Sequence, residues 1–283
     1  TSFYVIGDGV DLVLRSAPAD DAVFVFYERA MMRQEPELHG VLRSRTTVPV
    51  AEVVAFDDSR TVIDRDFILL ERLPGMPWTE IGTVNEDRVL GQVGEHLAQT
   101  HRITAEEYGY LGSHRPMAPS PSWAEAFTTM WDLLIEDVAG VGFYDSAESE
   151  MLRALLRRHH ALFDREVPSS LLHMDVWHQN ILLDDTGAVT GLIDWDRALW
   201  GDPEIEFAVL DYCGISQPAF WEGYGQARDT SAEASTRQVF YLLYELQKYI
   251  VIEQGRRNNA AKAQGYKRQV FDIVRHRLTL AKG

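Results

Sequence analysis

The sequence contains no long apolar run, no internal repeat and no low-complexity segment. A membrane-spanning helix needs about 20 consecutive apolar residues, so a protein of that kind is not expected. The single cysteine, Cys213, excludes an internal disulfide and is typical of a reducing cytoplasm. The first residues, which start at Thr1 without a methionine, carry no signal-peptide pattern, and we expect part of the natural chain to lie upstream of them.

Basic residues are also scarce. The chain has 27 Lys and Arg against 43 Asp and Glu, which gives a formal net charge of −16. Residues 234–283 hold ten Lys and Arg but only three Asp and Glu, so the acidic excess lies in residues 1–233. So acidic a body disfavours nucleic acid as a partner, because phosphates need basic neutralisation. It would attract a cationic ligand, although solubility or a salt-adapted proteome explains the charge equally well.

What the sequence has instead is the composition of a globular enzyme. Its 283 residues are 46% hydrophobic and 25% charged, which is enough to bury a core in one large domain or two modest ones. Strand-favouring runs dominate up to residue 70, and Leu73-Pro74-Gly75 then interrupts regular structure. We expect strands at residues 3–6, 10–14, 52–56 and 66–70 and a helix starting near Pro36, while the apolar run 22–27 fits either a strand or a helix.

After this break the pattern becomes mainly helical. Apolar spacing predicts helices at roughly residues 86–101, 123–138, 150–164, 203–213, 217–228, 236–254 and 260–280. One face of the second helix carries Trp123 and Trp131, which favours a core stripe over a substrate platform. We therefore predict an α+β fold with two lobes and a cleft between them: a small antiparallel-sheet N-lobe (residues 1–73) and a larger helical C-lobe (residues 74–283).

The most informative stretch lies in the second half of the chain. Asp175 and Asn180 belong to a loop, and the residues from Asn180 to Asp194 form two apolar runs around an Asp- and Gly-rich turn, which predicts a β-hairpin. Because antiparallel pairing brings the ends of a hairpin together, Asn180 and Asp194 should lie close to one another. Amide and carboxylate oxygens suit Mg²⁺ when phosphates complete its shell. Asp175 is placed to accept a proton from an attacking hydroxyl, so the stretch predicts metal-assisted phosphoryl transfer.

The pattern His-x-Asp175-x₄-Asn180, followed by Ile-Asp194-Trp-Asp, resembles the aminoglycoside phosphotransferase family, whose members have a protein-kinase-like fold. The order of the parts matches along nearly the whole chain. The resemblance implies that Asp175 is the catalytic base and that Asn180 and Asp194 hold Mg²⁺ against the β- and γ-phosphates. It also implies that His173 orients the catalytic loop.

The resemblance further assigns a nucleotide site to the N-lobe. Arg15 stands where the family usually has the Lys that grips the α- and β-phosphates. Members of the acyl-CoA-dehydrogenase-associated branch also have Arg there, which keeps the charge but presents a planar fork. Glu37 matches the helix carboxylate that pairs with this base, and Glu35 is a close rival.

The hinge strand of the family matches the run Phe-Ile-Leu-Leu-Glu-Arg-Leu that precedes the Pro-Gly break. The match implies that backbone groups of Glu71 and Leu73 meet the adenine edge, and that Leu182 and Ile193 form its apolar floor and wall. The family often supports its catalytic loop with an Asp three residues after Gly-Asp-Pro. This chain has Glu206 near that position, which keeps the carboxylate on a longer arm.

Several residues near the motif leave alternatives open. His178, together with His173 and Asp175, could bind Zn²⁺, but the spacing matches no zinc pattern that we can name. Trp177 resembles a Trp in the catalytic loop of the fructosamine-kinase branch, and packing under the cleft is an equal alternative. Asp196 can bond to the loop, touch the substrate or remain solvated. An acidic cluster is more typical of a solvated face than of a polyamine site; it comprises Glu136, Asp137, Asp145, Glu148 and Glu150.

Together these features predict a cytoplasmic enzyme that uses ATP, or alternatively GTP, and Mg²⁺ to phosphorylate a small hydroxyl-bearing molecule, as a monomer or homodimer. The acidic body and the resemblance favour an aminoglycoside or a similar cationic antibiotic as the acceptor. The alternative is a metabolic kinase of the same fold that acts on a ketosamine, a choline-like alcohol, an amino alcohol or a hydroxyacyl-CoA. A nucleotide-binding pseudo-enzyme is a second alternative. It is motivated by Arg15 and by the phosphate-covering loop that the resemblance places before Phe3, of which the given sequence holds only Thr1 and Ser2.

Overall fold

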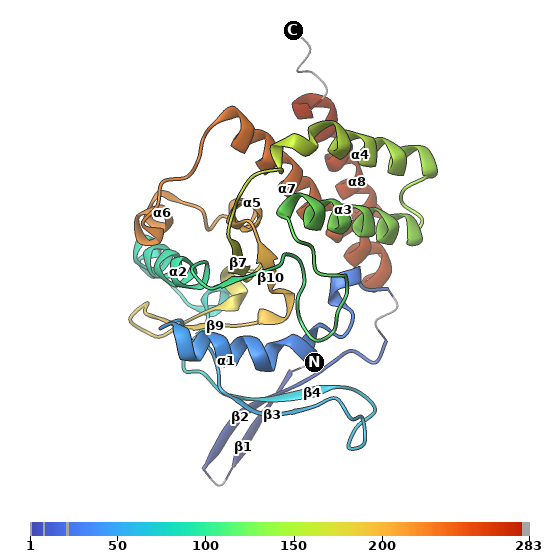
Figure 1. The fold of residues 1–283 in the computed structure, drawn as a ribbon. Helices are drawn as coiled ribbons and strands as arrows, with labels where there is room; N and C mark the ends of the chain where they lie inside the picture. Colours follow the sequence, from blue (N-terminus) through green and yellow to red (C-terminus); the bar gives the residue numbers. More distant parts are fainter. Residues whose placement is uncertain (1, 8, 21–22, 279–283) are drawn as a thin grey trace.

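The N-terminal part of the chain is built on a four-stranded antiparallel sheet with the strand order β1-β2-β4-β3. The computed structural model describes residues 2–7, 9–20 and 23–278. The strands are β1 (Ser2–Gly7), β2 (Val10–Ser16), β3 (Val53–Asp57) and β4 (Phe67–Glu71). The four predicted strands are therefore confirmed, while Asp8 in the predicted turn lies outside the described residues. β1 and β2 project from the body as a hairpin (Figure 1).

Helix α1 (Glu35–Arg45) lies between this sheet and the rest of the molecule (Figure 1). Its start near Pro36 was predicted, because proline suits the first helical turn. Acidic residues in its first turn and basic residues in its last turn complement the helix dipole. The apolar run before it forms no strand: Ala22 lies outside the described residues, and the rest leads into two short 3-10 helices, η1 (Phe26–Glu28) and η2 (Met31–Gln34).

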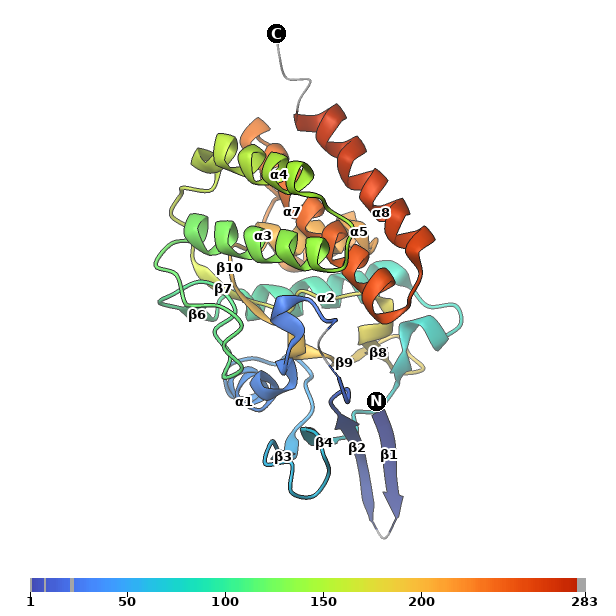
Figure 2. The same cartoon turned by 90° about the vertical axis from the view of Figure 1, so that its right-hand side faces the viewer.

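The larger part of the chain is helical, as predicted, and its main helices stack on the side of the molecule away from the first sheet (Figure 2). They are α2 (Glu86–Thr100), α3 (Trp123–Gly140), α4 (Ser146–His159), α5 (Pro203–Tyr212), α6 (Pro218–Tyr224), α7 (Ala232–Val251) and α8 (Ala260–Ile273). α6 is shorter than predicted because Gly225 takes a left-handed conformation (φ 75°) that ends it. α7 starts earlier than predicted because Ser231 caps it. A π-helical turn (Ile252–Arg256) follows α7.

Two three-stranded sheets in the larger part of the chain hold the loop from His173 to Asn180. The first has the order β5-β8-β9 and contains the predicted hairpin. The second has the order β10-β7-β6. Their strands are β5 (Met76–Pro77), β6 (Thr104–Ala105), β7 (Ser169–Leu172), β8 (Ile181–Leu183), β9 (Val189–Leu192) and β10 (Leu199–Gly201). The loop from His173 to Asn180 therefore runs from one sheet to the other, with both of its ends fixed by strands.

The largest core lies between α3, α4, α5, α7 and α8, and aromatic side chains fill it. Trp123 and Trp131 are both buried there, so the predicted core stripe is confirmed. Trp123 donates a hydrogen bond from Nε1 to the Tyr241 hydroxyl (2.8 Å), which satisfies its polar atom inside the core. Within the described part of the chain, no helix is long and apolar enough to span a membrane.

Candidate active site

The catalytic loop is held in an unusual backbone conformation next to Asp175. Met174 has a φ of 64°, in the left-handed region that side chains other than glycine seldom adopt. Its N–H donates to Glu206 Oε1 (2.6 Å), and the other oxygen of Glu206 lies 2.6 Å from His101 Nε2. All three residues are buried, so this pair stabilises the strained turn from inside the protein. Glu206 thus supports the catalytic loop, as the resemblance implied.

His173 has a supporting position in the same loop. Its Nε2 lies 3.0 Å from the Ile193 carbonyl oxygen, and its ring packs against Trp195 with centroids 4.3 Å apart. The side chain is fully buried. His173 therefore joins the loop to the open end of the β8–β9 hairpin, and it does not line the cavity described below.

Asp175 is held on both carboxylate oxygens. Arg197 Nη1 donates to Oδ1 (2.8 Å), and Asn180 Nδ2 donates to Oδ2 (3.1 Å). Burial alone would raise the pKa of Asp175, but the positive charges of Arg197 and Lys248 outweigh it and hold that pKa below its usual value. The carboxylate is therefore ionised and fixed in direction, as a proton acceptor requires.

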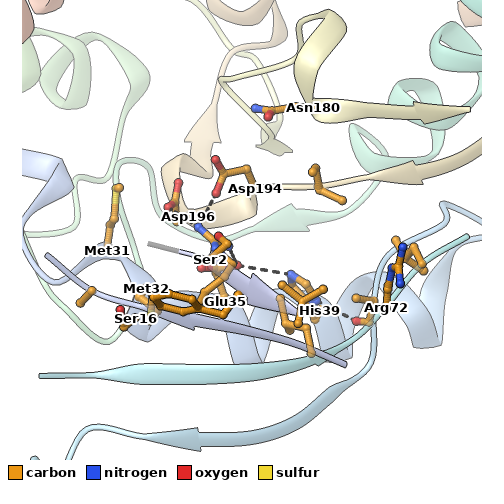
Figure 3. A pocket seen from close by; sticks show the side chains of 18 of the residues that line it. Ser2, Ser16, Met31, Met32, Glu35, His39, Arg72, Asn180, Asp194 and Asp196 are labelled. Carbon is orange, nitrogen blue, oxygen red and sulfur yellow. Dashed lines mark hydrogen bonds and ion pairs between the residues drawn. The ribbon is translucent and has the colours of Figure 1, made fainter. Parts of the chain in front are cut away.

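The hairpin brings Asn180 and Asp194 to one end, as predicted. Ile181 pairs with Leu192 across β8 and β9, and the Ile193 N–H donates to the Asn180 carbonyl (3.0 Å). Asp194 follows β9 with a φ of 72°, which turns its side chain out of the strand. In Figure 3 the side chains of Asn180 and Asp194 lie next to one another above the N-lobe sheet. Both line the same cavity.

Arg15, on β2, joins the first sheet to this end of the hairpin. Its Nη1 donates to Glu35 (2.6 Å), and its Nη2 bonds to Asp194 and to Asp196, the latter at 3.1 Å. The prediction that Glu37 pairs with Arg15 is wrong: Glu37 is exposed, and the partner is the buried Glu35 at the start of α1. The two residues lie about half a helical turn apart, so only one of them can face the sheet.

Burial shifts the acidity of the carboxylates around Arg15. It raises the pKa of Glu35 to about 7, although the charge of Arg15 opposes the shift. It also raises the pKa of Asp196, and the neighbouring Asp194 adds to that rise. Three carboxylates thus share one guanidinium in a partly dry site, an arrangement that favours an additional cation.

A cavity of about 780 Å³ connects these groups. Five of the six residues predicted at the nucleotide site line it, and Glu37 does not. The five are Arg15, Glu71, Leu73, Leu182 and Ile193. The cavity extends from this hinge region past Arg15 to Asn180 and Asp194, so one elongated ligand can reach both ends of it. Its size lies in the range typical of small-molecule and cofactor sites.

The residues that the sequence did not reveal lie on the other side of Asp175. Arg197 also donates to Glu28 (2.9 Å), and Arg256 donates to both oxygens of Glu28 (2.9 and 3.0 Å). Glu28 belongs to η1 and Arg256 to the π-helical turn after α7. No motif or periodicity marks either residue, because both are brought to the site by irregular segments.

Contacts also distinguish between the alternatives left open for His178 and Asp196. His178 packs against Trp78, with ring centroids 4.3 Å apart. Within the described ranges, no three His, Cys, Asp or Glu side chains gather as a zinc site would require. Asp196 bonds to Arg15, and its carbonyl oxygen accepts from Gln34 Nε2 (2.5 Å), so it is a buried part of the site and not a solvated loop carboxylate.

The acidic cluster in α3 and α4 has structural partners. Asp137 accepts from the Phe26 N–H (2.6 Å), and Asp145 caps α4 by accepting from the Glu148 N–H (2.8 Å). The other members form ion pairs: Glu136 with Arg153, Glu148 with Lys267 and Glu150 with Arg157. These contacts give the cluster a role in capping and packing, and they agree with the solvated face that the sequence favoured.

The sheet, the loop and the hairpin define a phosphotransferase of the protein-kinase-like fold. The solved structure of a thermostable mutant of aminoglycoside phosphotransferase APH(4)-Ia shares this fold: it has a TM-score of 0.64 at 19% identity, and the match covers 97% of this chain and 90% of that one. The family model for the phosphotransferase enzyme family matches residues 1–239. The chain belongs to that family.

The chain is also similar to two probable ketoamine kinases. A probable ketoamine kinase of Vibrio parahaemolyticus is 29% identical over 224 residues, which cover 75% of this chain and 71% of the relative. A probable ketoamine kinase of Vibrio vulnificus is 27% identical over 254 residues, which cover 86% of this chain and 80% of the relative. The chain is thus an enzyme that transfers a phosphoryl group to a hydroxyl-bearing acceptor.

Proposed function

We propose that this enzyme uses ATP and Mg²⁺ to phosphorylate a hydroxyl group of a ketosamine, a sugar joined to an amine. The single observation that carries the transfer chemistry is that Asn180 and Asp194 line one end of the cavity, while Asn180 Nδ2 donates to the carboxylate of Asp175 (3.1 Å). The relatives named as probable ketoamine kinases support the acceptor class. The chain would then be a metabolic kinase, which was the alternative at the level of sequence.

In this proposal the N-lobe, residues 1–73, holds the nucleotide. Backbone groups of Glu71 and Leu73 would meet the adenine, and Leu182 and Ile193 would cover its faces. Arg15 would release part of its contact with Asp194 and bind the phosphates, while Glu35 keeps the guanidinium in place. GTP is the alternative nucleotide. It would bind more weakly than ATP only if the backbone groups of the hinge distinguish guanine from adenine, so the test compares the two nucleotides.

The residues at the far end of the cavity would complete the reaction. Asn180 and Asp194 would hold Mg²⁺, whose charge neutralises the phosphate oxygens as the terminal phosphoryl group moves. Asp175 would take the proton of the attacking hydroxyl, because its carboxylate is ionised and keeps free lone pairs beside Arg197 and Asn180. His173 and Glu206 would keep the loop in position.

An aminoglycoside acceptor is the second candidate, and the net charge of −16 is the observation that favours it. The acidic cluster near α3 and α4 gives it little support, since its carboxylates already cap helices or pair with Arg and Lys. A weakly charged acceptor agrees better with these contacts.

The proposal is tested by measuring ADP release and the phosphorus-31 spectrum of the product with ATP, GTP, ketosamines and aminoglycosides. We expect turnover on ketosamines. Asp175→Ala should lower kcat by about 10³-fold while nucleotide affinity stays nearly unchanged. Asp185→Ala, which removes an exposed carboxylate from the hairpin turn, is the matched control and should change neither. Nucleotide binding without turnover on any acceptor would favour the pseudo-enzyme instead.

A further inference from the structure

Glu28 is a fully buried carboxylate that binds two arginines from distant parts of the chain. It belongs to η1, and its side chain is 0% exposed. Arg197 Nη2 donates to Oε1 (2.9 Å), while Arg256 Nη2 donates to both oxygens (3.0 and 2.9 Å). Glu28 also lines the cavity that contains Asp194. Since Arg197 binds Asp175 as well, a single side chain separates Glu28 from the proposed base.

The second arginine, Arg256, reaches Glu28 from an uncommon backbone conformation. It ends the π-helical turn after α7, and such turns are rare and occur often at functional sites. The preceding Gly255 packs closely on the chain before η1, because a Cβ atom there would lie 2.9 Å from the Val23 carbonyl oxygen. An ion pair with Arg256 alone would neutralise Glu28 in the interior. The contact with Arg197 therefore has a role other than keeping Glu28 buried.

Arg197 divides its two terminal nitrogens between two carboxylates. Nη1 donates to Asp175 Oδ1 (2.8 Å), and Nη2 donates to Glu28. A guanidinium that faces one carboxylate often binds both of its oxygens through two parallel hydrogen bonds. Glu28 prevents this at Asp175 because it occupies Nη2. Asp175 Oδ2 then has Asn180 as its partner (3.1 Å), so each oxygen of the base keeps a lone pair for the acceptor hydroxyl.

We propose that Glu28 is a positioning residue that restricts Arg197 to one oxygen of Asp175, and that Arg256 holds Glu28 in place. Without the Glu28 carboxylate, Arg197 would turn its second nitrogen towards Asp175 Oδ2. The base would then lose a lone pair that the acceptor hydroxyl needs, although nucleotide binding would not change. This inference rests on the proposed function, in which Asp175 is the base, and adds the residue that keeps this base available.

The first test is Glu28→Gln, which removes the charge and keeps the shape of the side chain. We expect kcat for a ketosamine to fall about tenfold, the factor that corresponds to one hydrogen bond, while the KM for ATP stays the same. Arg197→Lys in this background should raise kcat again by about threefold or more, since the single ammonium of lysine cannot bind both oxygens of Asp175 in parallel. A purely structural role of Glu28 predicts no such rescue.

Glu253→Gln is the matched control. Glu253 is also buried, at 2% exposure, and it pairs with Arg257 at the end of the same π-helical turn (2.7 Å). Its replacement should lower the unfolding temperature, as Glu28→Gln does, but leave kcat unchanged. Because Glu28→Gln leaves Arg256 without its carboxylate, Glu28→Gln/Arg256→Gln is measured beside it. This second variant should show the same loss of kcat, and thermal unfolding shows that it is folded.

A crystal structure of Glu28→Gln gives a result that does not depend on turnover, because Arg197 should bind both oxygens of Asp175 in it. The inference alone would be overturned by an unchanged kcat in both Glu28 variants, an equal loss in Glu253→Gln, no rescue by Arg197→Lys, or an Arg197 that keeps one contact with Asp175. Failure of the wild type to phosphorylate any ketosamine, with ATP bound, would overturn the proposed function. The crystal structure would still decide where Arg197 binds.

Discussion

At the end of the β8–β9 hairpin three carboxylates share the guanidinium of Arg15, whereas on the other side of Asp175 the carboxylates are matched by nearby cations. Glu35, Asp194 and Asp196 all contact Arg15. Arg197 binds both Asp175 and Glu28, and Glu28 has Arg256 as a second cation. Negative charge is thus in excess around Arg15, whereas beside Arg197 and Arg256 it is balanced by positive charge.

The pKa values follow this difference. Burial raises the pKa of Glu35 and Asp196, since one Arg cannot neutralise the whole cluster. Asp175 is also buried, yet the charges of Arg197 and Lys248 hold its pKa below the usual value. The pKa of a carboxyl group is therefore raised at Glu35 and Asp196 and lowered at Asp175, within one site. The negative excess suits a cofactor that brings positive charge, and the balanced side suits a base that must be ready before the acceptor arrives.

The largest effect should come from Asp194→Ala, which removes negative charge from the side that has the excess. We expect kcat to fall by about 10³-fold, because the proposed Mg²⁺ site would lose a ligand. Mg²⁺ with a non-hydrolysable ATP analogue should raise the unfolding temperature of the wild type and hardly change that of the variant. A variant that keeps this Mg²⁺-dependent stabilisation would show that Asp194 is no metal ligand.

Glu206→Gln should have the next largest effect, and it tests how the balanced side is supported. The change removes the negative charge from the contact with His101 and weakens the bond to the Met174 N–H. We expect the free energy of unfolding to drop by about 2 kcal/mol, since hydrogen bonds to a buried carboxylate are stronger than those to a neutral amide. We also expect kcat to fall about tenfold, since the left-handed turn before Asp175 is no longer held.

Chemical denaturation and steady-state rates measure the two effects of Glu206→Gln. Glu222→Gln, an exposed carboxylate on α6, is the control and should change stability by less than about 0.5 kcal/mol. A loss of stability without any loss of rate would mean that Met174 keeps its left-handed conformation without the Glu206 carboxylate.

A smaller effect should appear in the pH dependence of stability on the side with excess charge. Glu35 has a pKa of about 7 in the folded enzyme and an ordinary value of 4.5 when exposed, so the folded state binds more protons between these values. Its contribution to stability is therefore present at low pH and is lost as the pH rises from about 4.5 to 7. We expect Glu35→Gln to remove on the order of 2 kcal/mol of this decline.

Denaturant unfolding of the nucleotide-free enzyme at several pH values checks the expectation for Glu35. Because Arg15 keeps Asp194 and Asp196 as partners in Glu35→Gln, the variant should remain folded. If the free energies of unfolding of the wild type and of Glu35→Gln decline in parallel between pH 4.5 and 7, another group takes up the protons. The excess of negative charge then does not act through Glu35.

The sequence could predict those features of the site that local patterns of residues determine. Strands, helices and the β8–β9 hairpin follow from apolar spacing and turn residues, so the meeting of Asn180 with Asp194 was predictable. The choice between Glu35 and Glu37 was not. Both precede apolar helical positions, and only the packing of α1 on the sheet decides which one faces Arg15.

The balanced side could not be predicted for a different reason. Glu28 and Arg197 come from two short 3-10 helices and Arg256 from a π-helical turn, and these segments are far apart in the sequence. No periodicity links such segments, and only the tertiary fold brings their charges together. The acidic net charge was a poor guide here, because it describes the whole chain and not the immediate surroundings of Asp175.

The smallest effect should come from the acidic cluster, whose members the sequence could have assigned to a polyamine site. Glu150 pairs with Arg157, and the two side chains are 62% and 58% exposed, so Glu150→Gln should change stability by less than about 1 kcal/mol. It should also leave the KM of every accepted substrate unchanged in a steady-state assay, because the carboxylate faces solvent. A clear rise in KM for a cationic acceptor would place that acceptor against α4 and would show that the acidic cluster takes part in binding it.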